Sequence, residues 1–208
     1  GKPRDKSELP GALVAFDFWI PPRTAALYSV SAIFGLRDDA TGMTFVYPVS
    51  TKADLETQLN KWWRKEVVPF EHITVKNCCC DHENVNLTEE VRAWFEKKGV
   101  EFVPSPPHHK QRTNIIETVW RPLTAMVRKL LGDQDIVDFY FPAAFTAACS
   151  RMMLLPTRRN FGCGSPYMLW YNRRPKGEYI RVWGSRCSVK NFGVKNKLEQ
   201  QAHSGRYL

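Results

Sequence analysis

An aspartate interrupts the apolar run LVAFDFWI, which occupies residues 13–20. Residues of this kind, aromatic and β-branched, predict a buried strand. A carboxylate inside such a strand is costly unless a cation or a hydrogen-bond donor compensates it. Asp17 is therefore a candidate metal ligand. The alternative is that it faces solvent on the polar side of the strand.

Two further strands follow this run. Both are rich in β-branched and aromatic residues, and they are LYSVSAIFG at 27–35 and MTFVYPV at 43–49. Pro21-Pro22 and the stretch 37–42 supply turn residues between them. The three runs predict an antiparallel meander, with the first strand covering residues 12–20.

Helices and strands alternate after the meander. Leu55, Leu59, Trp62, Trp63 and Val67 recur at helical spacing behind a Ser50 or Thr51 cap. HITVKNCCC at 72–80 alternates poorly, as expected for a strand buried on both faces, and Asp81 ends it. The remaining predicted elements are a helix at 88–99, a strand at 100–103, a proline-containing loop at 104–113, a helix at 114–131 and a helix at 135–155 bent near Pro142.

This order predicts an α/β fold, an RNase H-like mixed five-stranded sheet with helices on both faces. Sites in such sheets form at the carboxyl ends of strands where the chain order switches sides, so Asp17 and Asp81 are expected side by side. We divide the chain into a linker at 1–11, a core at 12–157 and an incomplete, small β-rich extension at 158–208. Alternation in YIRVWGSRCSV predicts a strand pair or bent strand at 179–189.

The net charge of +9 is concentrated in the extension. Residues 1–150 carry 18 Lys and Arg against 19 Asp and Glu, whereas residues 151–208 carry 12 against 2. Such a segment suits a polyanion, because neutralising phosphates releases counterions. Candidate DNA contacts are Arg158, Arg159, Arg173, Arg174, Lys176, Arg181 and Arg186, with Tyr167, Trp170, Tyr171 and Trp183 as stacking or anchoring aromatics. The alternative is a solvated basic tail.

The helix at 114–131 has a polar face and an apolar face. Glu117, Arg121, Thr124 and Arg128 recur on the first, and Ile116, Leu123, Val127 and Leu130 on the second. The two arginines could lay phosphates beside Glu117, although an ordinary solvated face with an ion pair fits the same spacing. Pro122 predicts a kink or a late start. The preceding loop offers His108, His109, Lys110, Gln111 and Arg112 for DNA, or is simply exposed.

Six cysteines, at 78, 79, 80, 149, 163 and 187, form no C-x-x-C pair. Adjacent strand residues point to opposite faces, so the triplet at 78–80 is predicted to act as small apolar side chains rather than as a metal site. The sequence also lacks an apolar run of the roughly 20 residues needed to span a membrane. We therefore expect a soluble, intracellular protein without a membrane partner.

The carboxylates and three sequence blocks resemble the integrases of retroviruses and long-terminal-repeat retrotransposons. Asp81 and Glu117 are separated by 35 residues, the spacing common in that family, and Asp17 in AFDFWIPP matches its first aspartate. The segment after the core contains SPYMLWYNRRP, YIRVWGSRCSV and KLEQQAHSGRYL, which are similar to words that occur in this order after the catalytic core of copia-type elements. The opening GKPRD is similar to residues that follow the His-Cys zinc module of such integrases.

The resemblance implies a metal-dependent enzyme that trims DNA 3′ ends and joins them to a target. Asp17, Asp81 and Glu117 would be both its catalytic residues and its metal ligands, for two Mg²⁺ or Mn²⁺ ions about 4 Å apart. Asp17 would bridge the ions, and the other two carboxylates would each hold one. The implied partners are double-stranded DNA, from element ends and target, and further copies of the chain. The implied location is nuclear, with a cytoplasmic particle stage.

Two other readings stay open. One is a nuclease or DNA transposase of the same fold, which lacks the copia-like words. The other is a catalytically silent DNA-binding or assembly module derived from an integrase. It is suggested by His82 and Glu83 after Asp81, where such cores have Asn-Gly, and by Lys110 and Asn114 where they carry proline and glycine.

Overall fold

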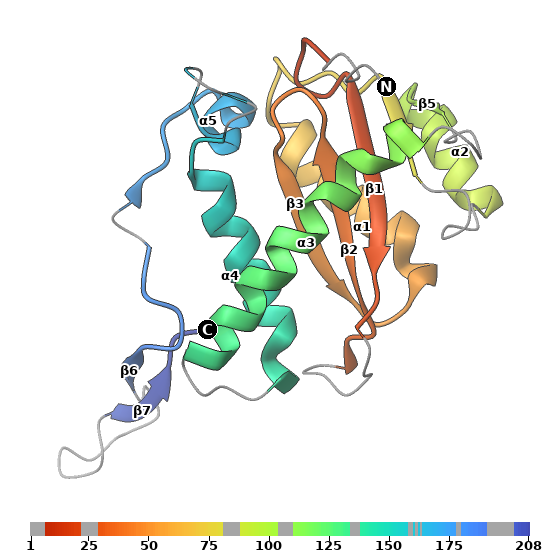
Figure 1. Ribbon diagram of the computed structural model, residues 1–208. Coiled ribbons are helices and arrows are strands. Elements are labelled where there is room, and N and C mark those ends of the chain that lie inside the picture. Colours follow the sequence, from red (N-terminus) through yellow and green to blue (C-terminus); the bar gives the residue numbers. More distant parts are fainter. Residues whose placement is uncertain are drawn as a thin grey trace.

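A computed structural model describes residues 7–21, 29–80, 88–103, 110–133, 138–157, 160, 162, 164–177, 180–190 and 202–208, with the backbone alone at 110–114, 133 and 138. A five-stranded sheet in the order β3-β2-β1-β4-β5 forms its centre (Figure 1). The strands are β1 (Leu13–Trp19), β2 (Ala32–Asp38), β3 (Thr44–Val49), β4 (Asn77–Cys79) and β5 (Glu101–Phe102). β1 pairs antiparallel with β2 and parallel with β4, so the sheet is mixed, as predicted.

The meander is confirmed, but its second strand lies further along the chain than the predicted 27–35. β2 continues to Asp38 because a tight turn joins it directly to β3. The Asp38 carboxylate holds that turn: it accepts hydrogen bonds from the backbone N–H of Gly11 at 2.9 Å and from both the N–H and the hydroxyl of Thr41 at 2.7 Å. Burial raises the pKa of Asp38, while these hydrogen bonds act in the opposite direction.

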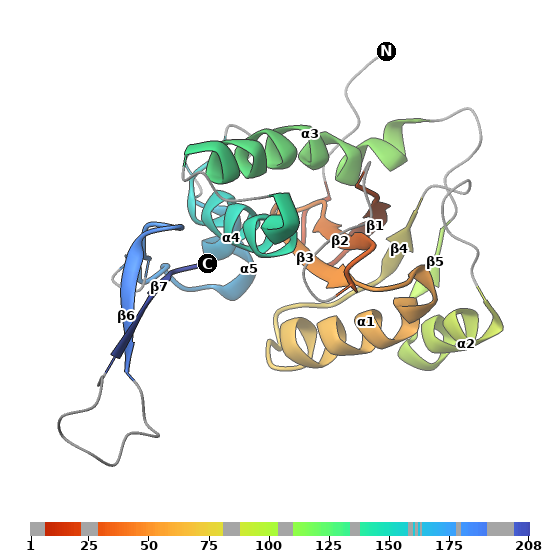
Figure 2. The same cartoon turned by 90° about the horizontal axis from the view of Figure 1, so that it is seen from below.

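Helices cover both faces of the sheet, as Figure 2 shows. One layer contains α1 (Leu55–Trp62), which continues as the π-helical segment η3 (Trp63–Val67), and α2 (Glu89–Lys98). The other contains α3 (Lys110–Asp133) and α4 (Phe141–Leu154). Alternate residues of β1 contact the two layers: the ring of Phe16 lies 6.2 Å from that of Phe95 in α2, and the ring of Trp19 lies 4.5 Å from that of Phe145 in α4.

Two predicted helix boundaries are wrong. α3 begins at Lys110, so residues 110–113 are helical rather than part of the loop; Lys, Gln and Arg are good helix formers, and the nearby prolines hid that signal. The late helix start that Pro122 suggested is also wrong, because Pro122 lies inside α3. α4 begins at Phe141, so Pro142 lies in its first turn, where a missing N–H costs nothing, instead of bending a longer helix. Residues 104–109 and 134–137 lie outside the described residues.

The four cysteines that the structure describes within the core are buried and pack as apolar side chains. Cys78, Cys79, Cys80 and Cys149 are buried and form no disulfide, and Cys187 is half-buried. Burial raises the pKa of Cys149 to about 12, so its thiol stays protonated at neutral pH. Cys163 lies outside the described residues. The prediction of small apolar packing residues is thus confirmed for the triplet.

A short helix not expected from the sequence fastens the extension to the core. α5 (Pro166–Tyr171) has Ser165 as its N-cap, whose hydroxyl accepts from the N–H of Met168. Trp170 is fully buried, and its indole N–H donates to the carbonyl of Glu66 in η3 at 3.2 Å. The Tyr171 hydroxyl donates to the buried Glu66 carboxylate at 2.5 Å. The α5 segment of the extension is therefore packed against the core.

A two-stranded antiparallel sheet lies beyond α5 and projects to one side of the molecule (Figure 1). Its strands are β6 (Arg186–Lys190) and β7 (Ala202–Arg206). The small β-rich extension is confirmed, but the strand predicted at 179–189 begins only at Arg186. Before it, the chain turns at Gly184, which has a positive φ of 79° and donates its N–H to the Tyr207 carbonyl. In the part of the chain that the structure describes, no helix combines the length and apolarity needed to cross a membrane.

Trp170→Ala should lower the free energy of unfolding by about 3–5 kcal/mol, because it empties a fully buried site and removes an indole donor from the Glu66 carbonyl. Urea denaturation followed by circular dichroism measures this. Tyr207→Ala is the control, since this tyrosine is 42% exposed and its loss should change stability by less than about 0.5 kcal/mol. Equal effects of the two substitutions would contradict the docking of α5 on the core.

Candidate active site

Asp17 is buried inside the sheet, and each of its carboxylate oxygens accepts a hydrogen bond, one from β1 and one from α3. Its side chain is 8% exposed. Oδ1 accepts from the N–H of Phe18 at 2.8 Å, and Oδ2 accepts from the indole Nε1–H of Trp120 in α3 at 3.0 Å. The alternative of a solvent-facing strand residue is therefore wrong. The compensating donor that a buried carboxylate needs is supplied, in this structure, by a tryptophan that the sequence did not single out.

A glycine makes room for this tryptophan. Gly35 of β2 is the residue paired with Asp17 across the sheet. A Cβ at position 35 would lie 2.5 and 2.7 Å from two ring carbons of Trp120, closer than atoms can approach. Two carbons of the benzo ring thus occupy the space beside Gly35 of β2, while the indole N–H donates to the carboxylate on β1. Any side chain at position 35 would displace it.

Glu117 lies on the same helix as Trp120, one turn earlier, and its side chain is exposed. Residues three apart on a helix are neighbours, with Cβ atoms roughly 5–6 Å apart. The two predicted faces of this helix are confirmed at most positions: Ile116, Leu123 and Val127 are buried, whereas Glu117, Arg121 and Arg128 are exposed. Thr124 and Leu130, assigned to the polar and the apolar face, are both half-buried. α3 therefore carries both a donor to Asp17 and an accessible carboxylate.

Asp81, the third predicted ligand, lies outside the described residues. Cys79 and Cys80, which precede it, are buried, and Cys79 pairs with Ala15 of β1. Among the residues that the structure describes, no group of three His, Cys, Asp or Glu side chains is placed to hold a metal ion. Because Asp81 is not among these residues, the three-carboxylate site stays a prediction.

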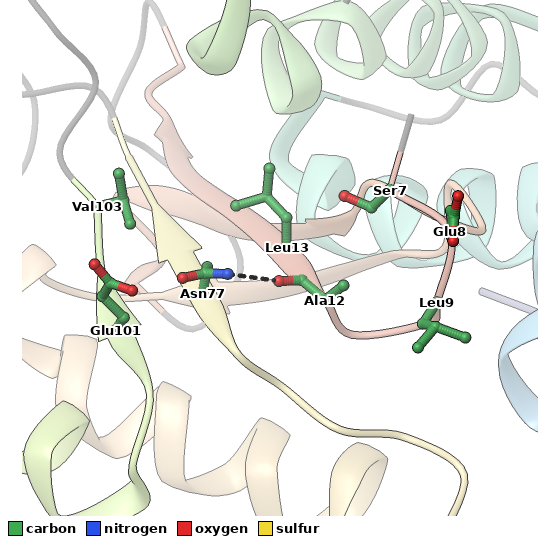
Figure 3. A pocket seen from close by; sticks show the side chains of 8 residues that line it. All are labelled: Ser7, Glu8, Leu9, Ala12, Leu13, Asn77, Glu101 and Val103. Atoms are coloured by element: carbon green, nitrogen blue, oxygen red, sulfur yellow. Dashed lines mark hydrogen bonds between the residues drawn. The ribbon is translucent and has the colours of Figure 1, made fainter. Parts of the chain in front are cut away.

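A surface pocket of about 570 Å³ lies at the other end of the parallel strands (Figure 3). Asn77 and Glu101, the first residues of β4 and β5, line it together with Leu13 at the start of β1. The Asn77 amide donates to the Ala12 carbonyl at 3.2 Å, the dashed line in Figure 3. This pocket is at the amino ends of the strands, so it is separate from the carboxyl-end site predicted for Asp17 and Asp81.

The predicted DNA-contacting cations are exposed wherever their side chains are described. These are Arg121 and Arg128 on α3, and Arg173, Arg174, Lys176, Arg181 and Arg186 in the extension. The first turn of α3 contains Lys110, Gln111 and Arg112, whose side chains lie outside the described part of the structure. The same holds for the whole of residues His108, His109, Arg158 and Arg159. The structure thus leaves the basic side chains accessible without showing what they bind.

The aromatic residues of the extension serve mainly to pack it. Trp170 and Trp183 are 0% and 2% exposed, so neither can stack on a nucleic-acid base, and that part of the prediction is wrong. Tyr167 and Tyr171 are half-buried, and the Arg173 guanidinium lies 5.9 and 5.4 Å from their ring centres. Ser165 followed by Pro166 is a helix-start signal that could have revealed α5.

Comparison with known proteins relates the chain to retroelement polyproteins and integrases. No family model matches it. It is 27% identical over 97 residues to the retrovirus-related Pol polyprotein from transposon RE2 of Arabidopsis thaliana, covering 47% of the chain. It is 24% identical over 160 residues, 72% of the chain, to the corresponding RE1 polyprotein of the same plant. The matches span only 7% and 10% of those polyproteins.

Solved structures agree with this relationship in fold. A chain of the simian T-cell lymphotropic virus intasome in complex with PP2A regulatory subunit B56 gamma aligns with a TM-score of 0.63 at 12% identity, covering 97% of this chain and 69% of that one. This chain has the integrase catalytic-core fold. The BIV integrase core aligns with a TM-score of 0.55 at 14% identity, over 78% of this chain and 95% of that one.

The magnesium complex of the HTLV-2 integrase core aligns with this integrase-fold chain at a TM-score of 0.58 and 12% identity, over 78% of this chain and 97% of that one. At these identities the structures establish the shared fold, while the two Pol polyproteins establish distant homology to copia-type retrotransposons. The resemblance seen in the sequence is thereby confirmed, as is the RNase H-like fold.

Proposed function

We propose that this chain is the catalytic core of a copia-type retrotransposon integrase, which performs metal-dependent DNA 3′-end processing and strand transfer through Asp17, Asp81 and Glu117. The observation that carries the proposal is the hydrogen bond that joins Asp17 of β1 to Trp120 of α3 within an integrase fold. Asp17 is a buried carboxylate held by Trp120, and Glu117 lies one turn from that tryptophan. A carboxylate has no packing reason to occupy the middle of this apolar strand.

The strand pairing supports Asp81 as the neighbour of Asp17. β1 and β4 run parallel, and Ala15 pairs with Cys79. Asp17 follows Ala15 by two residues, and Asp81 follows Cys79 by two residues. Directly paired residues of parallel strands point to the same face, so a continued register would put both carboxylates on the α3 side of the sheet.

The residues fit a hard divalent cation such as Mg²⁺ or Mn²⁺, which prefers carboxylate oxygens. Asp17 would be the ligand shared between two ions, and Asp81 and Glu117 would each hold one. When bound, two such ions lower the pKa of an attacking water or DNA 3′-hydroxyl and stabilise the departing oxygen. The buried setting of Asp17 fixes its position, whereas the exposure of Glu117 leaves it open to DNA.

Cations beside and beyond this site would hold the DNA. Arg121 and Arg128 continue the exposed face of Glu117 along α3, and arginine pairs well with phosphate oxygens. The extension adds a second exposed basic group that includes Arg174, Lys176 and Arg186. The proposal extends to duplex DNA of element ends and target as the partner, to a homo-oligomer, and to action in the nucleus after a cytoplasmic particle stage.

Asp81→Asn and Glu117→Gln should each reduce 3′-end trimming and strand transfer by at least about 10³-fold, because each removes a metal ligand without changing side-chain volume. The measurement is a Mn²⁺-dependent strand-transfer assay on short duplexes carrying element ends. Glu101→Gln is the matched control, since this exposed glutamate lies in the pocket at the amino ends of the strands and should retain full activity.

In the same assay, a wild-type chain that binds duplex DNA but neither cuts nor joins it would favour the catalytically silent assembly module. Cutting without joining would favour a nuclease of this fold. Loss of activity in Glu101→Gln equal to that in Glu117→Gln would show that the assay reports folding, and would contradict the assignment of the carboxylates.

Replacing Arg174, Lys176 and Arg186 together with alanine should flatten the salt dependence of duplex binding, because each lost phosphate contact reduces the slope by about 0.9. We expect a reduction of roughly two to three units in a fluorescence anisotropy titration. Point substitutions are preferable to deleting residues 151–208, since residues 151–154 belong to α4 and Trp170 and Trp183 are buried.

The matched control for this charge change is the triple substitution Lys76→Ala, Arg92→Ala and Lys97→Ala. These side chains are also exposed, but they lie directly before β4 and on α2, whereas the extension docks on Glu66 of η3. Their removal should leave the slope unchanged. If both triple variants flatten the slope equally, the extension is not the DNA-holding surface, and its charge serves general solubility instead.

A further inference from the structure

We propose that Trp120 is a positioning residue for the metal site: its indole N–H orients the Asp17 carboxylate toward the ions. The inference rests on the proposed function, and it adds a residue that sits outside the three carboxylates. Ligating carboxylates are commonly held by an outer hydrogen bond that fixes their orientation. Trp120 supplies such a bond to Oδ2 of Asp17 at 3.0 Å.

The indole is well suited to this task because it is only a donor. It has no lone pair for a metal and does not titrate near neutral pH. A carboxylate oxygen has about two acceptor sites, so accepting one N–H does not exhaust it. The bond therefore leaves the carboxylate chemically able to bind a cation while restricting how it can rotate. The backbone N–H of Phe18 restrains Oδ1 in the same way at 2.8 Å.

Surrounding residues hold the indole in place. Trp120 is 8% exposed, and its ring rests on Gly35, the residue directly paired with Asp17. Ile116, one turn earlier on α3, also lies against Gly35, with its Cδ1 3.3 Å from where a Cβ would be. Within the described strands of the five-stranded sheet, Gly35 is the position without a side chain, and α3 packs Trp120 and Ile116 against it.

This seating also couples two proposed ligands. Trp120 and Glu117 are neighbours on one helix, so the contact that orients Asp17 also fixes the position of the turn that carries Glu117. A competing interpretation is that the indole blocks Asp17, so that metal must displace it. The two interpretations predict opposite changes in metal affinity when the N–H is removed.

Trp120→Phe keeps an aromatic ring but removes the donor, and it should weaken Mn²⁺ binding by roughly 10- to 100-fold. Free Mn²⁺ measured by electron paramagnetic resonance gives the affinity without DNA or turnover. Trp94→Phe is the matched control: Trp94 is also buried and donates its indole N–H, to Asn60 at 2.8 Å, but does so between α2 and α1. Its Mn²⁺ affinity should equal that of the wild type.

A second measurement uses the unaltered chain and so does not depend on the variant folding. In a Mg²⁺ titration followed by NMR, the indole Hε1 resonance of Trp120 should shift with saturation and stay protected from solvent exchange, while that of Trp94 should not move. Exchange of the Trp120 proton with solvent on metal binding, or unchanged or tighter Mn²⁺ binding by Trp120→Phe, would overturn the inference while leaving the proposed function intact. Absence of any Mn²⁺ binding by the wild type would overturn both.

Discussion

The hydrogen bond from the Trp120 indole to the Asp17 carboxylate joins the two elements on which the rest of the site depends. A charged side chain in the middle of β1 is tolerated because donors from its own strand and from α3 reach it. The contact requires a glycine across the sheet at position 35, since a Cβ there would overlap the indole ring. Helix α3 is thereby held at one place over β1 and β2, and the orientation of Glu117 follows from that placement.

A second polar contact binds the extension to the core. Buried Glu66 accepts through its carbonyl from Trp170 and through its carboxylate from Tyr171, so helix α5 sits against the π-helical end of α1. Burial and the hydrogen bond to Glu66 raise the pKa of the Tyr171 hydroxyl, which keeps it protonated and donating. The basic residues after α5 therefore follow a segment that is packed on the core, as the proposed DNA-holding surface requires.

Much of this arrangement could be predicted from sequence because it depends on local patterns. Runs of β-branched and aromatic residues marked the three meander strands. The poorly alternating run at 72–80 marked a parallel strand, but only Asn77–Cys79 form it, and His72, Thr74 and Lys76 before it are exposed. Glycine at position 99, expected to end a helix, does so with a φ of 65°. The two faces of α3 followed from helical periodicity, and the RNase H-like fold followed from element order. The integrase assignment followed from the resemblance of the carboxylate spacing and of three sequence blocks to that family.

What escaped prediction depends on contacts between residues distant in sequence. Nothing near Trp120 indicates that it meets Asp17, which lies 103 positions away. Trp170 and Trp183 look like nucleic-acid stacking residues beside so many cations, but tertiary packing buries them. The start of α3 was misplaced because prolines at 104–107 outweighed the helix-forming residues that follow.

The central claim is that Asp17, Asp81 and Glu117 form one metal site beside an intact Trp120 contact. The most direct measurement is a crystal structure of the chain grown with Mn²⁺, with anomalous scattering used to locate the ions. The account predicts two peaks about 4 Å apart, shared by Asp17 and contacted by the other two carboxylates, with the indole still donating to Asp17. Density in which Asp81 points to the opposite face of the sheet, or no peak at Asp17, would contradict it.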